Sequence, residues 1–219
     1  MIDLFGRVVL IVTAIILILG GYQVYFWPQK NKNVSKRAIL FKVREIDKFI
    51  PFKPGWIWVY SGLYYPIIIY LVLIVSSFEQ FVFTAFSFIS LLFFQFLFFY
   101  LFPVKTPESW RLKIKDDDGL TLRFLKCVQG QDGPENCFPS MHCSVAMLTA
   151  MHLISMSALG DWSIVAFLFP LLIGISTLFT KQHYFVDVPA GFLLGWVNFK
   201  LYTLYAPILA ISESLVPPI

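Results

Sequence analysis

Charged side chains are scarce in this sequence of 219 residues. Asp, Glu, Lys and Arg make up only 14% of it, whereas hydrophobic residues make up 58% and the mean hydropathy is +0.74. Soluble domains are typically about one quarter charged, so the composition excludes that class and indicates an integral membrane protein. We expect a single membrane domain over residues 1–219, built from helices, because helices satisfy their own backbone hydrogen bonds in lipid.

Two kinds of pattern are also missing. The chain has no His-Glu-x-x-His motif and no paired-cysteine motif of the kind that binds zinc, so no metal or other cofactor is expected. A zinc site made from His142, His183 and Asp187 stays open as an alternative. No internal repeat is visible, which disfavours a small transporter, although a transporter and a noncatalytic scaffold remain the alternatives to an enzyme. Membrane lipids are the expected surroundings, and no nucleic-acid partner is expected.

Long apolar stretches dominate what is present. Crossing about 30 Å of hydrocarbon takes about 20 mainly apolar residues, and six stretches meet this requirement: residues 8–27, 56–76, 81–102, 140–159, 162–179 and 185–209. The predicted fold class is therefore an all-α, polytopic bundle of six transmembrane helices. The first stretch is alternatively a cleaved signal peptide, but it is longer than a usual signal core and lacks a small-residue cleavage pattern.

Basic residues gather on three of the connections. Of the 17 Lys and Arg, all but Arg7 and Lys200 follow the first, third or fifth span. An even number of spans places these three connections at one membrane face and both termini at the other. Residues that are about 40 positions apart can therefore meet at one end of the bundle, where helical membrane proteins build ligand sites.

Two histidines and an aspartate lie on these connections. Residues 138–144 read FPSMHCS, and residues 181–187 read KQHYFVD. His183 and Asp187 are four apart and would share a helix face, so the carboxylate can fix the imidazole tautomer that leaves the other ring nitrogen free to attack. His142 would supply a proton to a leaving oxygen. The predicted catalytic residues are His183, His142 and Asp187.

The same face offers groups suited to phosphate. We expect Lys105, Arg111 and Lys181 to bind phosphate oxygens, for which the planar fork of arginine is well suited. Free amides at the start of the fourth span, beside the Ser140 hydroxyl, would add an anion site. Because this site opens beside lipid, the expected partner and substrate is a phosphorylated lipid.

The two motifs resemble those of the type 2 phosphatidic acid phosphatase superfamily. Residues 46–66 are similar to a segment of the branch that contains inositol phosphorylceramide and sphingomyelin synthases. The resemblance implies that His142 acts as the acid, that His183 becomes phosphorylated and that Asp187 orients it. It also implies hydrolysis of a lipid phosphate such as phosphatidic acid, with transfer of a phospho-headgroup to a lipid hydroxyl as the alternative.

Three positions depart from the family motifs. Met141 stands where the second motif has glycine, and Thr177 stands where the third motif has arginine. Lys181 is expected to supply the missing charge, in which case Lys181→Ala abolishes turnover. The first motif has only a loose counterpart in Lys105 to Arg111, where Leu112 replaces proline.

Several other polar or small residues fit ordinary structural roles. We expect His152 to make a contact between helices, Cys143 to pack, and the Gly191 and Gly195 pair to allow close helix packing. The acidic triplet 116–118 is expected to form a solvated turn.

Sequence signals disagree on which side of the membrane the site faces. The basic connections satisfy the positive-inside rule and favour the cytoplasm. The family resemblance favours the exoplasmic, periplasmic or luminal side. Cys127 and Cys137 are ten residues apart, either as a disulfide, which would persist only in an oxidising compartment, or as ordinary thiols. On balance we expect the exoplasmic side.

Overall fold

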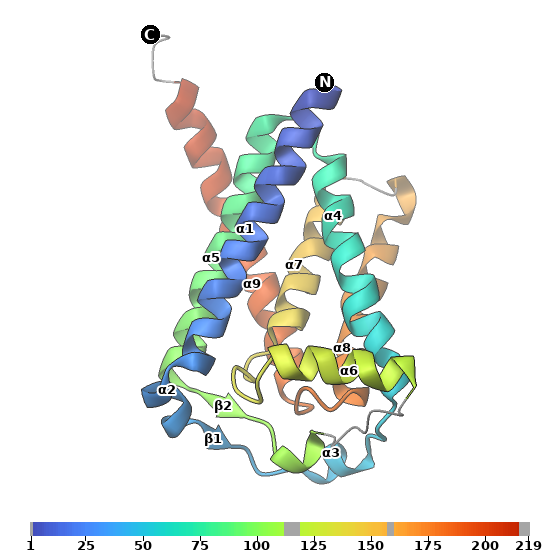
Figure 1. Cartoon of the computed structure of the whole chain (residues 1–219). Helices are drawn as coiled ribbons and strands as arrows, with labels where there is room; N and C mark the ends of the chain where they lie inside the picture. The colour runs from blue at the N-terminus through green and yellow to red at the C-terminus, as the bar shows by residue number, and fades with distance from the viewer. Residues whose placement is uncertain (1, 112–118, 157–159, 215–219) are drawn as a thin grey trace.

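The computed structural model describes residues 2–111, 119–156 and 160–214, except for the side chains of 161–163 and 207–214. Its helices run mostly along one axis, with both termini at one end and the shorter elements gathered at the other (Figure 1). The helices are α1 (Leu4–Lys30), α2 (Lys32–Arg37), α3 (Glu45–Phe49), α4 (Tyr64–Ile74), α5 (Phe78–Leu101), α6 (Leu120–Gln131), α7 (Met141–Ser155), α8 (Leu168–Phe179) and α9 (Asp187–Ser214). The two short strands are β1 (Ile39–Leu40) and β2 (Val104–Lys105).

Among the described residues, three helical segments are long and apolar enough to cross a membrane. They are α1, the segment Pro54–Ile74 that ends with α4, and α5. Only 6% of the most apolar window of α1 is buried, so this helix presents most of its surface outward, as expected in lipid. The chain is thus a membrane protein, and the three-span minimum is a coarser result than the six spans predicted from the sequence.

The fourth and fifth predicted spans are shorter than expected. The helix predicted over residues 140–159 is α7, which has 15 residues and therefore extends about 22 Å, less than the hydrocarbon thickness. The fifth is the apolar helix Ile164–Phe179. α7 lies at the centre of the bundle and packs against α4, α5, α8 and α9. Burial by these helices explains why its sequence is mainly apolar.

Side chains at the helix starts explain where three helices begin. The Asp3 carboxylate accepts a hydrogen bond from the Gly6 amide (2.8 Å) at the start of α1. Ser77 accepts one from the Gln80 amide (3.0 Å) at the start of α5, and Ser140 accepts one from the Cys143 amide (3.4 Å) at the start of α7. Each side chain satisfies an amide that has no partner within its own helix.

Two glycines set the close contact between α7 and α9. A Cβ atom on Gly191 would lie 2.5 Å from the Ser140 carbonyl oxygen, and one on Gly195 would collide with the Ser144 carbonyl. The packing role predicted for this glycine pair is therefore confirmed. The contact brings the start of α7 against the start of α9, where the predicted catalytic residues lie.

The end of the bundle opposite the termini contains elements that hydrophobic periodicity did not predict. Strands β1 and β2 pair in parallel, with Ile39 opposite Val104 and Leu40 opposite Lys105, and so join the first long connection to the second. α6 lies across this end of the bundle (Figure 1). The second span begins with the π-helical turn Trp58–Leu63. The predicted convergence of these connections at one end is seen directly.

Candidate active site

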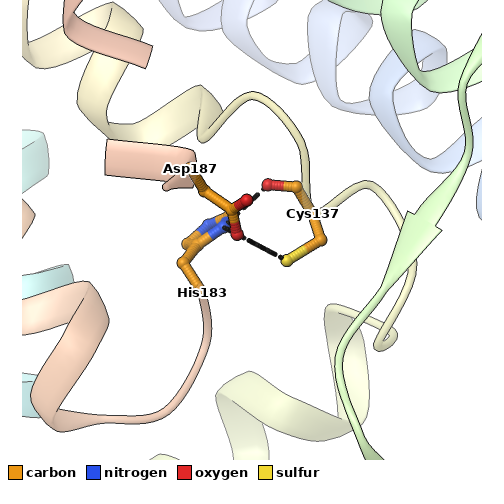
Figure 2. A group of neighbouring side chains, drawn as sticks. All are labelled: Cys137, His183 and Asp187. Atoms are coloured by element: carbon orange, nitrogen blue, oxygen red, sulfur yellow. Dashed lines mark hydrogen bonds and ion pairs between the residues drawn. The ribbon is translucent and has the colours of Figure 1, made fainter. Parts of the chain in front are cut away.

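The Asp187 carboxylate is the centre of a buried cluster. Its Oδ2 atom accepts hydrogen bonds from the Cys137 thiol (2.8 Å) and the Tyr184 amide (2.8 Å), and lies 3.2 Å from His183 Nδ1. Figure 2 shows both the thiol and the carbonyl of Cys137 turned toward His183 and Asp187. Asp187 is fully buried and His183 is 6% exposed. Three donors converge on one carboxylate oxygen, which fixes the carboxylate in place.

The position of the proton on His183 follows from its neighbours. Nδ1 lies 2.9 Å from the Cys137 carbonyl oxygen and 3.2 Å from Asp187 Oδ2, and both of these atoms are acceptors. Nδ1 must therefore carry hydrogen, and Nε2 of the neutral ring is left with its lone pair. This is the tautomer that the sequence predicted for a nucleophilic histidine. The structure differs in one respect, because α9 begins at Asp187 and His183 lies in the turn before it.

His142 has a contrasting, aromatic environment. Its Nδ1 lies 3.0 Å from the Tyr60 hydroxyl, and its ring centroid lies 4.1 Å from that of Tyr60 and 4.8 Å from that of Tyr64. If the phenol donates to Nδ1, the proton of the neutral imidazole resides on Nε2. A general acid needs the imidazolium form, in which Nδ1 donates to the phenol oxygen and the Nε2 proton is left for a leaving group.

The backbone ties the two histidines to each other. The Ser140 amide donates to the Asp187 carbonyl (3.1 Å), which joins the start of α7 to the start of α9. His142 lies two residues after Ser140, and His142 and His183 are within electrostatic reach of each other. The structure thus brings together all three predicted catalytic residues.

A comparison with protein-family profiles gives the family of this chain. The profile of the PAP2 superfamily matches residues 55–201, which is most of the chain and contains both histidines and Asp187. The chain belongs to the PAP2 superfamily. Comparisons with curated proteins and with solved structures found no match. Membership supports a phosphatase-type enzyme and agrees with the resemblance read from the two motifs.

In this PAP2 protein, Ser140 and Thr177 serve the backbone. Ser140 is fully buried, with its hydroxyl capping α7 and its amide bonded to Asp187. The Thr177 hydroxyl donates to the Gly174 carbonyl (2.7 Å) within α8. Both side chains thus bond to groups of the backbone. No charge stands at position 177, where the family motif has arginine.

Two predicted phosphate ligands lie close to the site but differ in their contacts. Lys105 is half-buried on β2, and its carbonyl accepts a hydrogen bond from the Tyr184 hydroxyl (3.1 Å). Its ammonium group has no hydrogen-bond partner among the described residues. The Lys181 ammonium donates to the Asp47 carbonyl (2.8 Å) and lies 5.0 Å from the centre of the Trp110 ring. Burial lowers the pKa of Lys181, and the charge of Asp47 opposes this effect.

Arg111 has a role that the sequence did not suggest. Its guanidinium donates to the carbonyls of Gln129 (2.8 Å), Asp132 (2.6 Å) and Gly133 (2.5 Å). These carbonyls lie at the end of α6 and just beyond it, where helices leave acceptors without partners. Arg111 thus holds the chain between α6 and α7, and its role as a phosphate ligand stays a prediction. Leu112 and residues 116–118 lie outside the described residues.

The structure decides between the disulfide and the free thiols that the sequence left open. Cys127 and Cys137 do not form a disulfide, because Cys127 is exposed on α6 and the Cys137 thiol bonds to Asp187. The cysteines therefore give no indication of an oxidising compartment. Cys143 is buried against Gly191, as expected of a packing residue. His152 contacts Ser87 through Nε2 (2.7 Å), which confirms its predicted role between helices.

Cys137, His183 and Asp187 also offer three metal-binding atoms within 4.8 Å of one another. Burial raises the pKa of the Cys137 thiol well above its ordinary value, as does the nearby Asp187 charge. The thiol donates to Asp187 Oδ2, and the Cys137 carbonyl accepts from His183 Nδ1, so two of the three atoms are already engaged in hydrogen bonds. The Tyr184 amide also points at the oxygen that a metal would need. The cluster therefore fits a hydrogen-bonded nucleophile better than a zinc centre.

Three functional candidates were missed by sequence reasoning. Tyr60 contacts His142 from 82 positions away. Asp47 accepts a hydrogen bond from the Phe185 amide (2.8 Å) and so holds the turn that carries His183. Asp132 faces a cavity beside His142. Each contact joins distant connections, and no local pattern in the sequence points to it.

Two cavities meet beside His142. The first has a volume of about 290 Å³ and is lined by His142, by Asp132 and by aromatic residues. The second is apolar, has a volume of about 160 Å³ and lies between α1, α4 and α5. Tyr22, Tyr64, Tyr65 and Met141 line both. Met141, which replaces the glycine of the family motif, thus lines both the cavity beside His142 and the apolar cavity between α1, α4 and α5.

Proposed function

We propose that this protein hydrolyses a phosphorylated lipid through a phosphohistidine on His183. The observation that carries the proposal is the environment of His183, where two acceptors hold the proton on Nδ1 and leave Nε2 as the nucleophile. The apolar cavity between α1, α4 and α5, which shares Tyr64 and Met141 with the cavity beside His142, supports a lipid substrate. An ester of phosphatidic acid type fits both features.

In the first step, His183 Nε2 attacks phosphorus and the bond from phosphorus to the leaving oxygen breaks. His142, as the imidazolium, gives its Nε2 proton to that oxygen, so the lipid alcohol departs neutral and the His142 ring is left neutral. Asp187 stabilises the positive charge that develops on the His183 ring, in the way that a triad aspartate supports its histidine. In the second step, His142 takes a proton from water, and the resulting hydroxide attacks phosphorus and releases phosphate from His183.

The second candidate function is transfer to a lipid hydroxyl instead of to water. A specific observation favours it, namely the cavity of about 290 Å³ beside His142, which has room for a headgroup or an acceptor. The same residues serve both reactions, since only the acceptor of the second step changes. The PAP2 profile supports phosphatase-type and phosphotransferase-type activity alike.

The test uses the purified full chain in detergent. Phosphatidic acid, and a phosphosphingolipid with and without an alcohol acceptor, are supplied, and phosphate release and new phospholipid are measured. We expect turnover in the wild type and none in His183→Ala, together with acid-labile phosphate on the wild-type protein after rapid quenching. His152→Gln is the matched control, because it changes a buried histidine outside the site. Equal turnover in His183→Ala and the wild type would overturn the proposal.

We propose that the site faces the exoplasmic, periplasmic or luminal side, which now rests on the family resemblance alone. Cys127 is exposed at the same end of the bundle as the catalytic residues, whereas Cys137 and Cys143 are buried. A membrane-impermeant maleimide should therefore label Cys127 in intact cells, with Cys127→Ser as the control. Labelling that occurs only after the membrane is permeabilised would place the site in the cytoplasm.

A further inference from the structure

The cavity beside His142 is walled by aromatic rings. Its lining includes Tyr22, Tyr25, Trp58, Tyr60, Tyr65 and Phe124, which come from α1, from the π-helical turn and α4, and from α6. The rings of Trp58 and Phe124 lie 4.9 Å apart. Hydrocarbon chains need no such wall, since aliphatic side chains suffice for them. Ring faces carry partial negative charge and attract cations.

One carboxylate, that of Asp132, also lines this cavity. Its Oδ1 atom accepts hydrogen bonds from the Tyr25 hydroxyl (2.8 Å) and the Gln29 amide group (2.8 Å), both from α1. No lysine or arginine among the described residues forms an ion pair with it. Arg111 is nearby but directs its hydrogen bonds to backbone carbonyls, including that of Asp132 itself. The carboxylate is therefore fixed in orientation, and no cation of the described residues pairs with it directly; burial raises its pKa, while the hydrogen bonds from Gln29 and Tyr25 and the charge of Arg111 oppose this effect.

A negative charge at this position is unexpected if phosphate is the only charged group of the substrate. Like charges in a site shielded from water repel each other strongly, so Asp132 would oppose the binding of a bare phosphate ester. A substrate that carries a positive charge next to its phosphate would reverse the sign of this interaction.

We propose that this cavity binds the ammonium group of an aminoalcohol headgroup, with Asp132 as its counter-ion and the surrounding rings as its cation–π partners. This inference rests on the proposed function, because it places the phosphate of the same substrate between His142 and His183. The substrate class is then a zwitterionic phospholipid, in which the cationic headgroup extends from the phosphate into the aromatic cavity and the hydrocarbon lies toward α1, α4 and α5.

Binding to the purified full chain is measured by protection of Cys127 from a maleimide, since this exposed thiol lines the cavity and the other two cysteines are buried. The ligands are phosphocholine, inositol phosphate, and 3,3-dimethylbutyl phosphate, which has the shape of phosphocholine but lacks the positive charge of its headgroup. We expect phosphocholine to protect at a concentration at least about tenfold lower than either of the other two. Equal protection by phosphocholine and its isostere, or tighter binding of inositol phosphate, would overturn the proposal.

Substitutions test which residues cause the preference for phosphocholine. Asp132→Asn keeps the Oδ1 acceptor for Tyr25 and Gln29 but removes the charge, and it should abolish the preference for phosphocholine. Glu135→Gln is the control, because this nearby carboxylate bonds to Ser35 and does not line the cavity. Trp58→Leu should weaken phosphocholine binding several-fold while Trp58→Phe largely retains it, which keeps the proposal testable if Asp132→Asn fails to fold. A loss in neither Asp132→Asn nor Trp58→Leu would contradict it.

Binding and turnover are separate readouts. Preferential phosphocholine binding without turnover of any phospholipid would remove the proposed reaction but leave the ammonium site standing. Turnover of phosphatidic acid without preference for phosphocholine would do the reverse.

Discussion

His142 and His183 are the same side chain in opposite surroundings. His183 lies in a turn, where a carboxylate and a carbonyl accept from Nδ1. His142 lies in the first turn of α7, with its ring tilted against those of Tyr60 and Tyr64 and only a phenol at Nδ1. An anionic neighbour stabilises a ring that becomes positively charged, whereas an aromatic and neutral environment favours a ring that donates a proton. The proposed roles, attack by His183 and proton transfer by His142, rest on this difference.

The largest test of this contrast is Asp187→Asn. The variant keeps the size of the side chain but removes the charge that supports His183, and an amide can present a donor to Nδ1 and reverse the tautomer. We expect kcat to fall by about 10³- to 10⁴-fold, as when a triad aspartate is replaced. Thermal unfolding of the variant provides the control for folding. A loss of less than tenfold in a folded variant would show that His183 does not depend on Asp187.

Removing His142 should produce a loss that depends on the leaving group. For a lipid ester, His142→Ala is expected to lower kcat by about 10²- to 10³-fold, the usual contribution of a general acid. A nitrophenolate departs without a proton, so the initial burst of nitrophenol, which reports the first step alone, should be largely restored in His142→Ala and absent in His183→Ala. Equal rescue of both variants, or of neither, would break the assignment of roles.

Tyr60→Phe tests the positioning of His142 more gently. The variant keeps the ring and removes only the hydroxyl at Nδ1. We expect about a tenfold loss of turnover with the lipid ester, as for one buried hydrogen bond, and little loss in the nitrophenol burst of the nitrophenyl ester. A loss of equal size on both substrates would assign Tyr60 to folding instead of to proton transfer.

The smallest effect is expected at Cys137. Cys137→Ala removes one of the donors to Asp187 Oδ2 but leaves the Tyr184 amide and His183 in place, so kcat should fall only about threefold to tenfold. Cys137→Ser keeps a donor and should retain most of the activity, with Cys127→Ser as the matched control. Complete inactivity of a folded Cys137→Ser would indicate that the thiol itself takes part in the chemistry.

The proposed catalytic residues could be read from the sequence, whereas the residues that contact them could not. His142, His183 and Asp187 lie in two short motifs, and an even number of apolar stretches is enough to place these motifs at one face. Tyr60, Asp47 and Asp132 act through contacts that join separate connections, so no local spacing reveals them. Arg111 was read as a phosphate ligand because its charge is visible in the sequence, whereas the carbonyls that it caps are not.

Span lengths show a similar limit. Residues 140–159 are apolar enough to suggest a full membrane crossing, yet α7 ends at Ser155. A helix surrounded by α4, α5, α8 and α9 is apolar because it is buried in protein, and hydropathy does not distinguish protein surroundings from lipid. Boundaries of the outward-facing helices α1 and α5 agree with the prediction to within a few residues.

α1 precedes the segment that matches the PAP2 profile, yet it supplies Tyr22, Tyr25 and Gln29 around the headgroup-sized cavity. The residues proposed to break the phosphate ester all lie within the matched segment. α1 thus adds to the proposed headgroup cavity from outside the matched segment, whereas Asp132, Trp58 and Phe124 lie within it. Substitutions in α1 can accordingly change which lipid is accepted without altering the two histidines, so the first helix is the place to look when members of this family differ in substrate.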